Sequence, residues 1–164
     1  MESKTCCFIG HRKIDVTSSL QDALKKLIEN LIVHENVKTF LFGSKSGFDD
    51  LCLLLVSEMK KVYPHIKRVY VRSVYPELSE SYLRYLLTLY GETYMPKQVE
   101  NAACASYVKR NQEMINRSDF LVFYYNEHYT PTPKRQSGTE RAYQYAVRKN
   151  KKQKKKIFNV YKQG

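Results

Sequence analysis

The hydrophobic positions along the chain alternate between short continuous runs and longer segments with helical spacing. Continuous apolar runs predict strands that are buried on both faces. Segments in which apolar residues recur every three or four positions predict amphipathic helices. The predicted strands are Thr5–Ile9, Val37–Phe42, Ile66–Val71, Phe120–Tyr125 and Ile157–Tyr161. The predicted helices are Leu20–Ile32 with a cap at Ser18 or Ser19, Phe48–Val62, Ser79–Leu89, Ala105–Asn116 and Thr139–Arg148.

The pattern is least regular between the third predicted strand and the fourth predicted helix. Gly91 is expected to end the helix before it, because glycine is often found just past a helix end. The stretch Tyr94–Glu100 has no clear period and is predicted to be a loop. A second loop is predicted at Asn126–Gln136, which is polar and contains Pro131 and Pro133.

Strands that alternate with helices predict an α/β fold. Parallel pairing with right-handed crossovers places helices on both faces of the sheet. We therefore predict a Rossmann-like three-layer fold with a mainly parallel sheet of about five strands. A length of 164 residues fits one domain. Residues 1–164 are assigned to that single domain, with residues 73–105 as a helical insert or lid.

The aromatic content is unusual in kind, with 14 Tyr, 7 Phe and no Trp. Tyrosine joins an apolar ring to a polar tip, which suits half-buried walls and ligand pockets. Several tyrosines lie in the insert, where two interpretations remain open. The segment is either a helix packed through aromatic core contacts, or a lid or dimer element that stacks on a base. The residues concerned are Tyr75, Tyr82, Tyr85, Tyr90 and Tyr94, with Arg72 and Arg84.

Composition narrows the class of protein. Apolar residues make up 43% of the chain, which is ordinary for a soluble globular protein. The start of the chain is polar and charged, so no signal peptide is expected, and no apolar run approaches the length of a membrane span. Cys6 and Cys7 are expected on opposite faces of one strand. With Cys52 and Cys104 they form no zinc-binding spacing. We expect a cytoplasmic protein with reduced thiols, no metal and no cofactor.

Positive charge is concentrated near the carboxyl end of the chain. The formal net charge is +12, and residues 148–156 include Arg148 and the lysines of the run Lys149 to Lys156. Basic residues suit the end of a helix, where they face its negative dipole. The alternative is a patch for nucleic acid or an acidic partner. No aromatic residues are interleaved and no groove-reading motif is present, so the first interpretation is favoured.

Glycine with small hydroxyl or basic neighbours occurs at three predicted strand ends or helix starts. The segments are Gly10-His11-Arg12, residues 43–50 and Ser137-Gly138-Thr139-Glu140. Parallel strands end at the same edge of a sheet, where ligands bind in such folds. Glycine lets backbone N–H groups approach an anion, and a helix start adds free N–H groups. Each segment alone is also explained by tight turning and helix capping.

Together the segments predict one site for a phosphate-bearing ligand. Serine and threonine hydroxyls would donate to phosphate oxygens, and His11 and Arg12 would add positive charge. None of the segments is a Walker A loop, and no Gly-x-Gly-x-x-Gly is present. The candidate ligand-binding residues are Gly10, His11, Arg12, Gly43, Ser44, Ser46, Gly47, Asp49, Arg110, Asn111, Ser137, Gly138, Thr139 and Glu140.

Two charged residues within helices have alternative roles. Asp49 either caps its helix or accepts hydrogen bonds from a ribose hydroxyl, while its neighbour Asp50 is expected to face solvent. Arg110 lies in the middle of a predicted helix that runs straight into an apolar strand. It is either a surface arginine or lies on the face that contacts the sheet.

These motifs, in this order, resemble the SLOG superfamily, a Rossmann-like group that includes LOG-type phosphoribohydrolases and DprA-like proteins. FIGHR at residues 8–12 matches the strand followed by Gly-His-Arg that opens a small bacterial and phage branch. GSKSGFDDL at 43–51 is similar to a Gly-x-x-x-Gly-x-Asp element of the family. RNQEMINRSDFLVFYY at 110–125 is similar to the family's arginine helix and core strand, and SGT at 137–139 resembles its Gly-Thr phosphate loop.

The resemblance implies a nucleotide-type ligand over these loops, a dimer or higher homo-oligomer, and a family-variable segment at 73–105. In LOG-type enzymes an Arg before the core strand and a Glu three residues after the Gly-Thr pair serve N-glycosidic hydrolysis. Arg110 matches the Arg. The Glu is not matched, because Ala142 stands three residues after Thr139 and Glu140 follows it directly.

Three functions are implied by the resemblance together with these residues. The favoured one is a module that senses or sequesters a nucleotide, or a signal derived from NAD or a cyclic nucleotide, without cleaving it. The second is a nucleoside 5'-monophosphate phosphoribohydrolase, which needs a carboxylate near the anomeric carbon; Glu140 and Asp49 are then the catalytic candidates. The third is DprA-like binding of single-stranded DNA through the lysine run.

Overall fold

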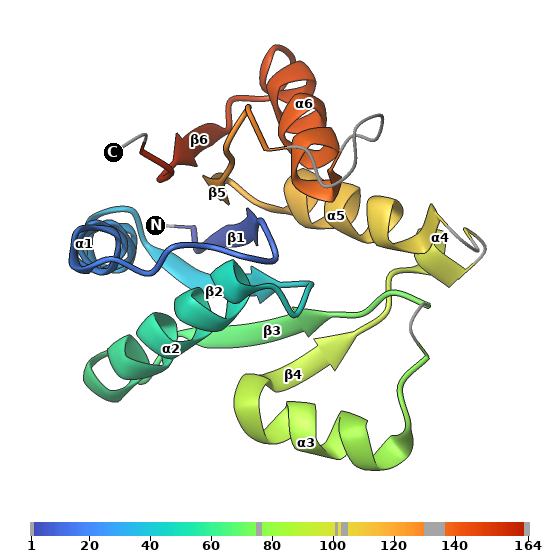
Figure 1. The fold of residues 1–164 in the computed structure, drawn as a ribbon. Helices are drawn as coiled ribbons and strands as arrows, with labels where there is room; N and C mark the ends of the chain where they lie inside the picture. Colours follow the sequence, from blue (N-terminus) through green and yellow to red (C-terminus); the bar gives the residue numbers. More distant parts are fainter. Residues whose placement is uncertain (1, 75–76, 101, 103–104, 130–136, 163–164) are drawn as a thin grey trace.

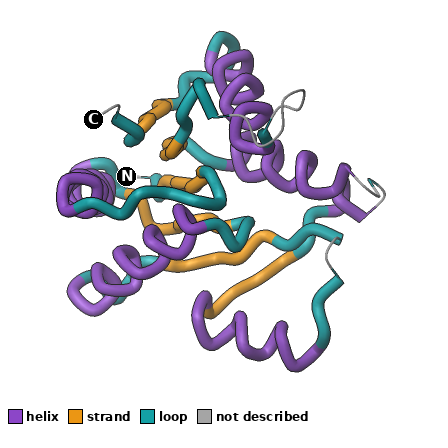
Figure 2. The backbone as a smooth tube through the Cα atoms, in the orientation of Figure 1, coloured by secondary structure: helices purple, strands orange, loops and turns teal. Residues whose placement is uncertain are grey.

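The chain forms a single six-stranded sheet in which every strand is parallel to its neighbours. The description comes from a computed structural model and covers residues 2–74, 77–100, 102, 105–129 and 137–162. Figures 1 and 2 show the strands as a twisted layer with helices on either side. The α/β prediction is therefore confirmed, with six strands rather than about five.

Strands and helices alternate along the chain, apart from two consecutive helices before the fifth strand. The strands are β1 (Lys4–Gly10), β2 (Val37–Phe42), β3 (Lys67–Val71), β4 (Gly91–Tyr94), β5 (Phe120–Tyr124) and β6 (Lys156–Asn159). The helices are α1 (Ser18–His34), α2 (Gly47–Val62), α3 (Glu80–Tyr90), α4 (Lys97–Glu100), α5 (Ser106–Arg117) and α6 (Gly138–Asn150).

Each face of the sheet has its own hydrophobic core. Side chains of α1, α2 and α3 pack on one face, and side chains of α5 and α6 pack on the other. Cys6 lies in the first core and Cys7 in the second, which confirms the prediction that they point to opposite faces of β1. Burial raises the pKa of the Cys7 thiol to about 12, so this thiol stays protonated and unreactive. Cys104 lies outside the described residues.

Hydroxyl side chains fix the starts of the main helices. Thr17, Ser46, Ser79 and Ser137 each precede a helix and accept a hydrogen bond from a backbone N–H inside its first turn. At the other end of α3, Gly91 has a φ of 79°, a left-handed conformation that favours glycine. The predicted helix end at Gly91 is therefore confirmed.

The stretch after Gly91 differs from the prediction. Residues Gly91–Tyr94 form β4, which pairs with β3, and Lys97–Glu100 form the short helix α4 rather than a loop. Two of the four β4 residues are exposed, because β4 is the edge strand of the sheet. An apolar run therefore does not mark it. Residues 73–105 thus include one of the two edge strands of the sheet together with its crossover helix α3.

The order of the strands reverses at one point. Across the sheet the order is β4-β3-β2-β1-β5-β6, so successive crossovers run outward from β1 to β4 and then return to β5. Ligands in folds of this type bind beyond the carboxyl ends of the strands, next to such a reversal. Here that edge carries the loops after β1, β2 and β5. Within the described residues, no helix is long and apolar enough to cross a lipid bilayer.

Candidate functional site

Direct contacts join the loop after β1 to the start of α2. The Gly47 N–H donates to the Arg12 carbonyl at 2.7 Å. A Cβ added at Gly47 would lie 2.8 Å from that same oxygen, so the two backbones approach each other more closely than a side chain allows. The Arg12 side chain itself is exposed. Two of the three predicted glycine segments therefore lie against each other, and Arg12 borders them on the solvent side.

Gly43, which follows β2, leaves room for the side chain of Arg110, which comes from the helix layer on the other face of the sheet from α2. A Cβ added at Gly43 would lie 2.5 Å from Met114 Sδ and 2.9 Å from both Cδ and Nε of Arg110. Arg110 belongs to α5, yet it lies close enough to Asp49 in α2 and to Tyr70 in β3 to shift their pKa values. The Arg110 side chain therefore crosses the carboxyl edge of the sheet at the position where Gly43 has no side chain.

Arg110 is a buried cation with little compensation. Its side chain is only 7% exposed. Burial lowers the pKa of its guanidinium, while Tyr70 and Asp49 raise it. Its Nε donates to Asn111 Oδ1 at 3.2 Å, and no carboxylate of the described residues lies within 4.0 Å of its nitrogens. A buried charge without an ion pair is costly, so this arrangement favours an anion.

Asp49 fastens the loop after β2 to the start of α2. Its Oδ2 accepts hydrogen bonds from the Ser44 N–H at 2.7 Å and the Ser44 hydroxyl at 2.6 Å. The Asp49 N–H donates to the Ser46 hydroxyl at 3.0 Å. Its Oδ1 is buried without a hydrogen-bond partner among the described residues. Asp50 is exposed, as predicted.

Burial raises the pKa of Asp49 from 3.8 to about 6, although the Ser44 hydrogen bonds and the Arg110 charge act in the opposite direction. Because its pKa is higher folded than unfolded, Asp49 stabilises the fold fully below about pH 3.8. This stabilisation is lost as the pH rises through about 6 and amounts to about 3 kcal/mol. We expect Asp49→Asn to remove this part of the pH dependence of the unfolding free energy.

Chemical denaturation at several pH values between 4 and 8 tests this expectation. The difference in unfolding free energy between Asp49→Asn and the wild type should shift in favour of the variant as the pH rises. Asp50→Asn is the matched control, since it removes the neighbouring, exposed carboxylate. Parallel pH profiles for Asp49→Asn and the wild type would contradict the assignment.

His11 does not add charge to the site, which corrects the prediction. The ring is 3% exposed, and its Nε2 accepts a hydrogen bond from the Asn126 N–H at 2.9 Å. An accepting ring nitrogen carries no proton, and burial lowers the pKa of the imidazole. The His11 N–H also donates to the Tyr124 carbonyl at 3.3 Å, and the ring lies 4.4 Å from that of Tyr129. His11 thus joins the ends of β1 and β5 as a neutral group.

The start of α6 is a capped helix terminus. Ser137 is the cap, and its hydroxyl accepts from the Glu140 N–H at 3.0 Å. Among the described residues, a Cβ at Gly138 would meet nothing closer than the Tyr107 ring at 3.8 Å. Thr139 is buried and Glu140 is partly exposed. The predicted loop at 126–136 is described only as far as residue 129, so Pro131 and Pro133 lie outside the described residues.

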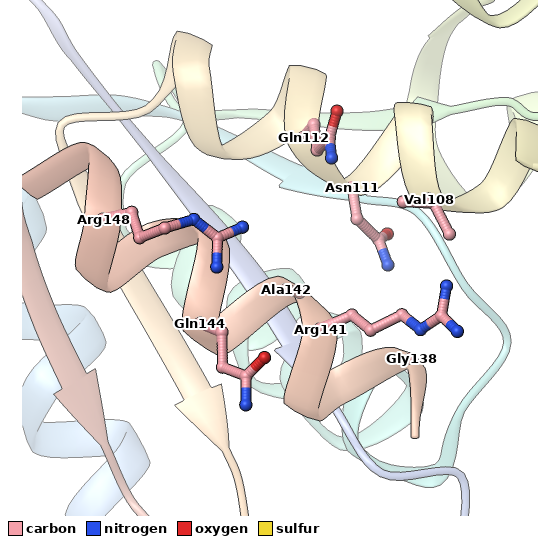
Figure 3. A pocket seen from close by; sticks show the side chains of 8 residues that line it. All are labelled: Val108, Asn111, Gln112, Gly138, Arg141, Ala142, Gln144 and Arg148. Carbon is pink, nitrogen blue, oxygen red and sulfur yellow. The ribbon is translucent and has the colours of Figure 1, made fainter. Parts of the chain in front are cut away.

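A hollow of about 300 Å³ lies between α5 and α6 (Figure 3). Asn111 and Gly138, both predicted site residues, line it. In Figure 3 the guanidinium of Arg141 extends toward the side of the hollow on which Asn111 lies. Its lining consists of Val108, Asn111, Gln112, Gly138, Arg141, Ala142, Gln144 and Arg148.

The arginines of this hollow were not among the predicted site residues. Arg141, Gln144 and Arg148 recur at intervals of three and four in the sequence, which places them on one face of α6. That spacing was a usable signal. Arginines near a helix end are also expected in solvent, so the spacing alone does not identify a site.

The lysine run is partly structural. The Lys155 ammonium donates to the carbonyls of Asn116 at 3.1 Å and Ser118 at 2.6 Å, where α5 ends. The other lysines from 151 to 156 are exposed. Lys155 therefore stabilises the carboxyl end of α5 rather than that of the helix it follows, which gives part of the run a structural role.

The tyrosines of residues 73–105 do not form one surface. Tyr90 is buried against Phe42 and Tyr70, as a core contact. Tyr82 and Tyr85 of α3 lie over the Lys45 ammonium, with Tyr82 at 4.0 Å from ring centre to nitrogen. Tyr82 and Tyr85 therefore contact the loop after β2. The lid interpretation stays a prediction. Tyr75 lies outside the described residues.

The structure brings most of the predicted residues into one connected group at the carboxyl edge. Contacts link the loop after β1 to the start of α2, and the loop after β2 to Arg110. Asn111 and Gly138 line the same hollow. Within the described residues, no three His, Cys, Asp or Glu side chains gather to hold a metal ion. The group can therefore offer an anion one buried cation, backbone N–H groups and two exposed arginines.

Comparison with known proteins assigns no family. A scan against protein-family models finds no match to this chain, and a search of curated proteins finds none either. The resemblance to the SLOG superfamily therefore rests on the motifs of the chain itself and stays a prediction.

Proposed function

We propose that this protein binds a phosphate-bearing, nucleotide-like ligand at the carboxyl edge of its sheet and acts as a sensor or sequestering module. The observation that carries the proposal is Arg110. Its guanidinium is buried, has no carboxylate within ion-pair distance among the described residues, and lies where α/β folds of this type bind ligands. A phosphate would supply the missing negative charge and accept bidentate hydrogen bonds from the guanidinium.

The surroundings of Arg110 supply further groups suited to a phosphate. Asn111 is the next residue on the same helix, and it shares a hollow with Gly138 and the exposed Arg141. The N–H groups in the first turn of α6 are directed toward the start of that helix, as is the positive end of its dipole. An amide, an exposed arginine and a helix start therefore line one hollow, next to the helix that carries Arg110.

Binding without cleavage is favoured by the state of the carboxylates. Asp49 is buried, with one oxygen engaged by the backbone and the hydroxyl of Ser44. It cannot approach a sugar without breaking the loop that it holds. Glu140 stands in the first turn of α6, next to the backbone that would hold the phosphate. Neither carboxylate is placed as a free general base near an anomeric carbon.

Calorimetric titration with AMP, GMP, CMP and UMP, with base release followed in the same samples, tests the proposal. We expect saturable binding of at least one nucleotide with no free base. Binding should persist at 0.5 M salt, since a buried ion pair is screened less than an exposed one.

Two results would contradict the proposal, and each favours another function. Stoichiometric release of free base would indicate a phosphoribohydrolase. Binding of single-stranded DNA that falls steeply with salt, without any nucleotide binding, would indicate a DNA-binding protein that uses the lysine run.

A further inference from the structure

A second hollow, of about 320 Å³, lies beyond the carboxyl ends of β5 and β6. β1, where the strand order reverses, lies between this hollow and Gly43, which follows β2. Three tyrosines line it: Tyr125 just after β5, Tyr161 just after β6, and Tyr143 on α6. All three side chains are partly exposed. A volume of this size is at the lower end of the range of ligand pockets, roughly 300–1,000 Å³.

The aromatic rings of this hollow are held in place by packing and by a side-chain clamp. The Tyr125 and Tyr143 rings lie 4.8 Å apart at 33°, and Tyr143 packs edge-on against buried Phe123. Asn159 accepts from the Tyr125 N–H at 3.0 Å and donates to the Tyr125 carbonyl at 2.9 Å. This extends the pairing of β5 and β6 by one residue and fixes the backbone that carries the ring.

Polar side chains beside the rings have amide N–H groups with no acceptor among the described residues. The side-chain oxygen of Asn126 accepts from the His128 N–H at 3.0 Å, and this bond uses neither of its own amide N–H groups. Asn159 uses one amide N–H on Tyr125 and has a second. Both side chains line the hollow. Flat rings next to amide donors suit a planar heteroaromatic group that carries hydrogen-bond acceptors at its edge.

One nucleotide can span the distance between this hollow and the residues proposed to hold its phosphate. Tyr143 is three residues beyond Glu140 on α6, which is about one helical turn, or roughly 5 Å along the axis. Glu140 also lies close enough to Tyr125 to raise the pKa of that phenol, after the larger effect of burial. On the strand side, the Asn126 backbone is bonded to His11 in the β1 loop.

We propose that the hollow lined by Tyr125, Tyr143 and Tyr161 is a nucleobase subsite, in which the base of the bound ligand stacks on tyrosine while its phosphate lies toward the start of α6. This inference rests on the proposed function and specifies which end of the ligand each part of the site holds. It assigns base recognition to the β5–β6 end of the sheet rather than to the tyrosines of residues 73–105.

The test compares three probes on variants of the two stacked rings. The probes are the tightest-binding monophosphate of the four above, its nucleoside, and ribose 5-phosphate. Tyr125→Leu and Tyr143→Leu should each weaken the monophosphate and the nucleoside by roughly 5- to 100-fold, since both lose base stacking. Ribose 5-phosphate should bind these variants within twofold of wild type.

Matched substitutions separate loss of the ring from loss of the fold. Tyr125→Phe and Tyr143→Phe keep the ring and should keep nucleotide affinity within threefold of wild type. Tyr85→Leu tests the alternative that the tyrosines of residues 73–105 hold the base, since it removes the exposed ring of α3 that lies beside Lys45, and nucleotide affinity should stay within twofold of wild type. Thermal melting of each variant shows whether the fold is retained, which matters most for Tyr143 because it packs on Phe123.

The outcomes separate this inference from the proposed function. Unchanged monophosphate affinity in folded Leu variants, with ribose 5-phosphate still bound, would overturn the subsite and leave the proposed function intact. Tyrosine-dependent binding of the nucleoside, with no binding of ribose 5-phosphate, would support the subsite and overturn the phosphate site. No binding of any probe at millimolar concentration would overturn both.

Discussion

Gly10→Ala is expected to lower the unfolding free energy by about 2–3 kcal/mol, the upper part of the range for overpacking. A Cβ at this position falls within 2.6 Å of three Phe48 atoms. Phe48 has no room to move, because it is fully buried and its ring contacts those of Phe8 and Tyr124. For a domain of this size the melting temperature should fall by roughly 4–12 °C.

A second substitution tests whether the Phe48 ring is the cause. In Gly10→Ala/Phe48→Leu the smaller side chain leaves space for the new Cβ, so the double variant should lose less free energy than the two single variants combined. Gly138→Ala is the control, since a Cβ there meets no atom of the described residues closer than 3.8 Å. It should change the unfolding free energy by no more than about 0.5 kcal/mol. Additive effects of the Gly10 and Phe48 substitutions would contradict the explanation.

Arg110→Met is expected to weaken binding of a nucleoside monophosphate by at least about 100-fold, the effect of losing a buried, charge-assisted contact to phosphate. Methionine keeps an aliphatic stem beside Gly43 and removes the guanidinium, with its charge and its hydrogen bond to Asn111. The unfolding free energy should change by no more than about 1 kcal/mol, because the lost attraction to Asp49 is offset by relief of a buried charge. Calorimetric titration and chemical denaturation measure the two effects.

Lys109→Met is the matched control for that variant. Lys109 precedes Arg110 on the same helix and is exposed, so this substitution makes the same change in net charge. It should leave affinity within about twofold, as expected for an exposed charge screened by salt. Equal loss of affinity in both variants would mean that overall charge rather than a specific contact holds the ligand. If Arg110→Met does not fold, the role of Arg110 is to stabilise the fold rather than to bind a ligand.

Much of the fold was predictable because its core strands are apolar on both faces. Runs such as CCFI in β1 and FLVFY in β5 can only be accommodated between two layers of helices, and their strands were located to within one or two residues. The edge strand β4 was not predictable in this way. Its sequence GETY is short and half exposed, and its pairing with β3 depends on the position that α3 gives it.

The positions of the candidate site residues in the fold were predictable, but several of their contacts were not. Gly10 and Gly43 lie at strand ends, as predicted. A side chain at Gly10 would clash with Phe48, and one at Gly43 would clash with Arg110. Those partners lie far away in the sequence, so no local pattern reveals them. The neutral state of His11 depends in the same way on an N–H of the loop after β5.

The aromatic hollow shows the same limit. Tyr125 and Tyr161 follow neighbouring parallel strands, so their proximity could be inferred only once the strand order was known. Tyr143 joins them from α6 because that helix crosses back over β5. The tyrosine-rich segment 73–105 drew attention by composition, whereas the tyrosines that line a hollow are dispersed along the sequence.

Mass spectrometry of the small molecules released from this protein, purified gently from its native cells, tests the central claim most directly. We predict a phosphate-bearing nucleotide or nucleotide derivative with its glycosidic bond intact, released in stoichiometric amount from the wild type and absent from Arg110→Met. Wild-type protein that releases no such molecule, and that binds none of the four monophosphates when they are supplied, would contradict the account.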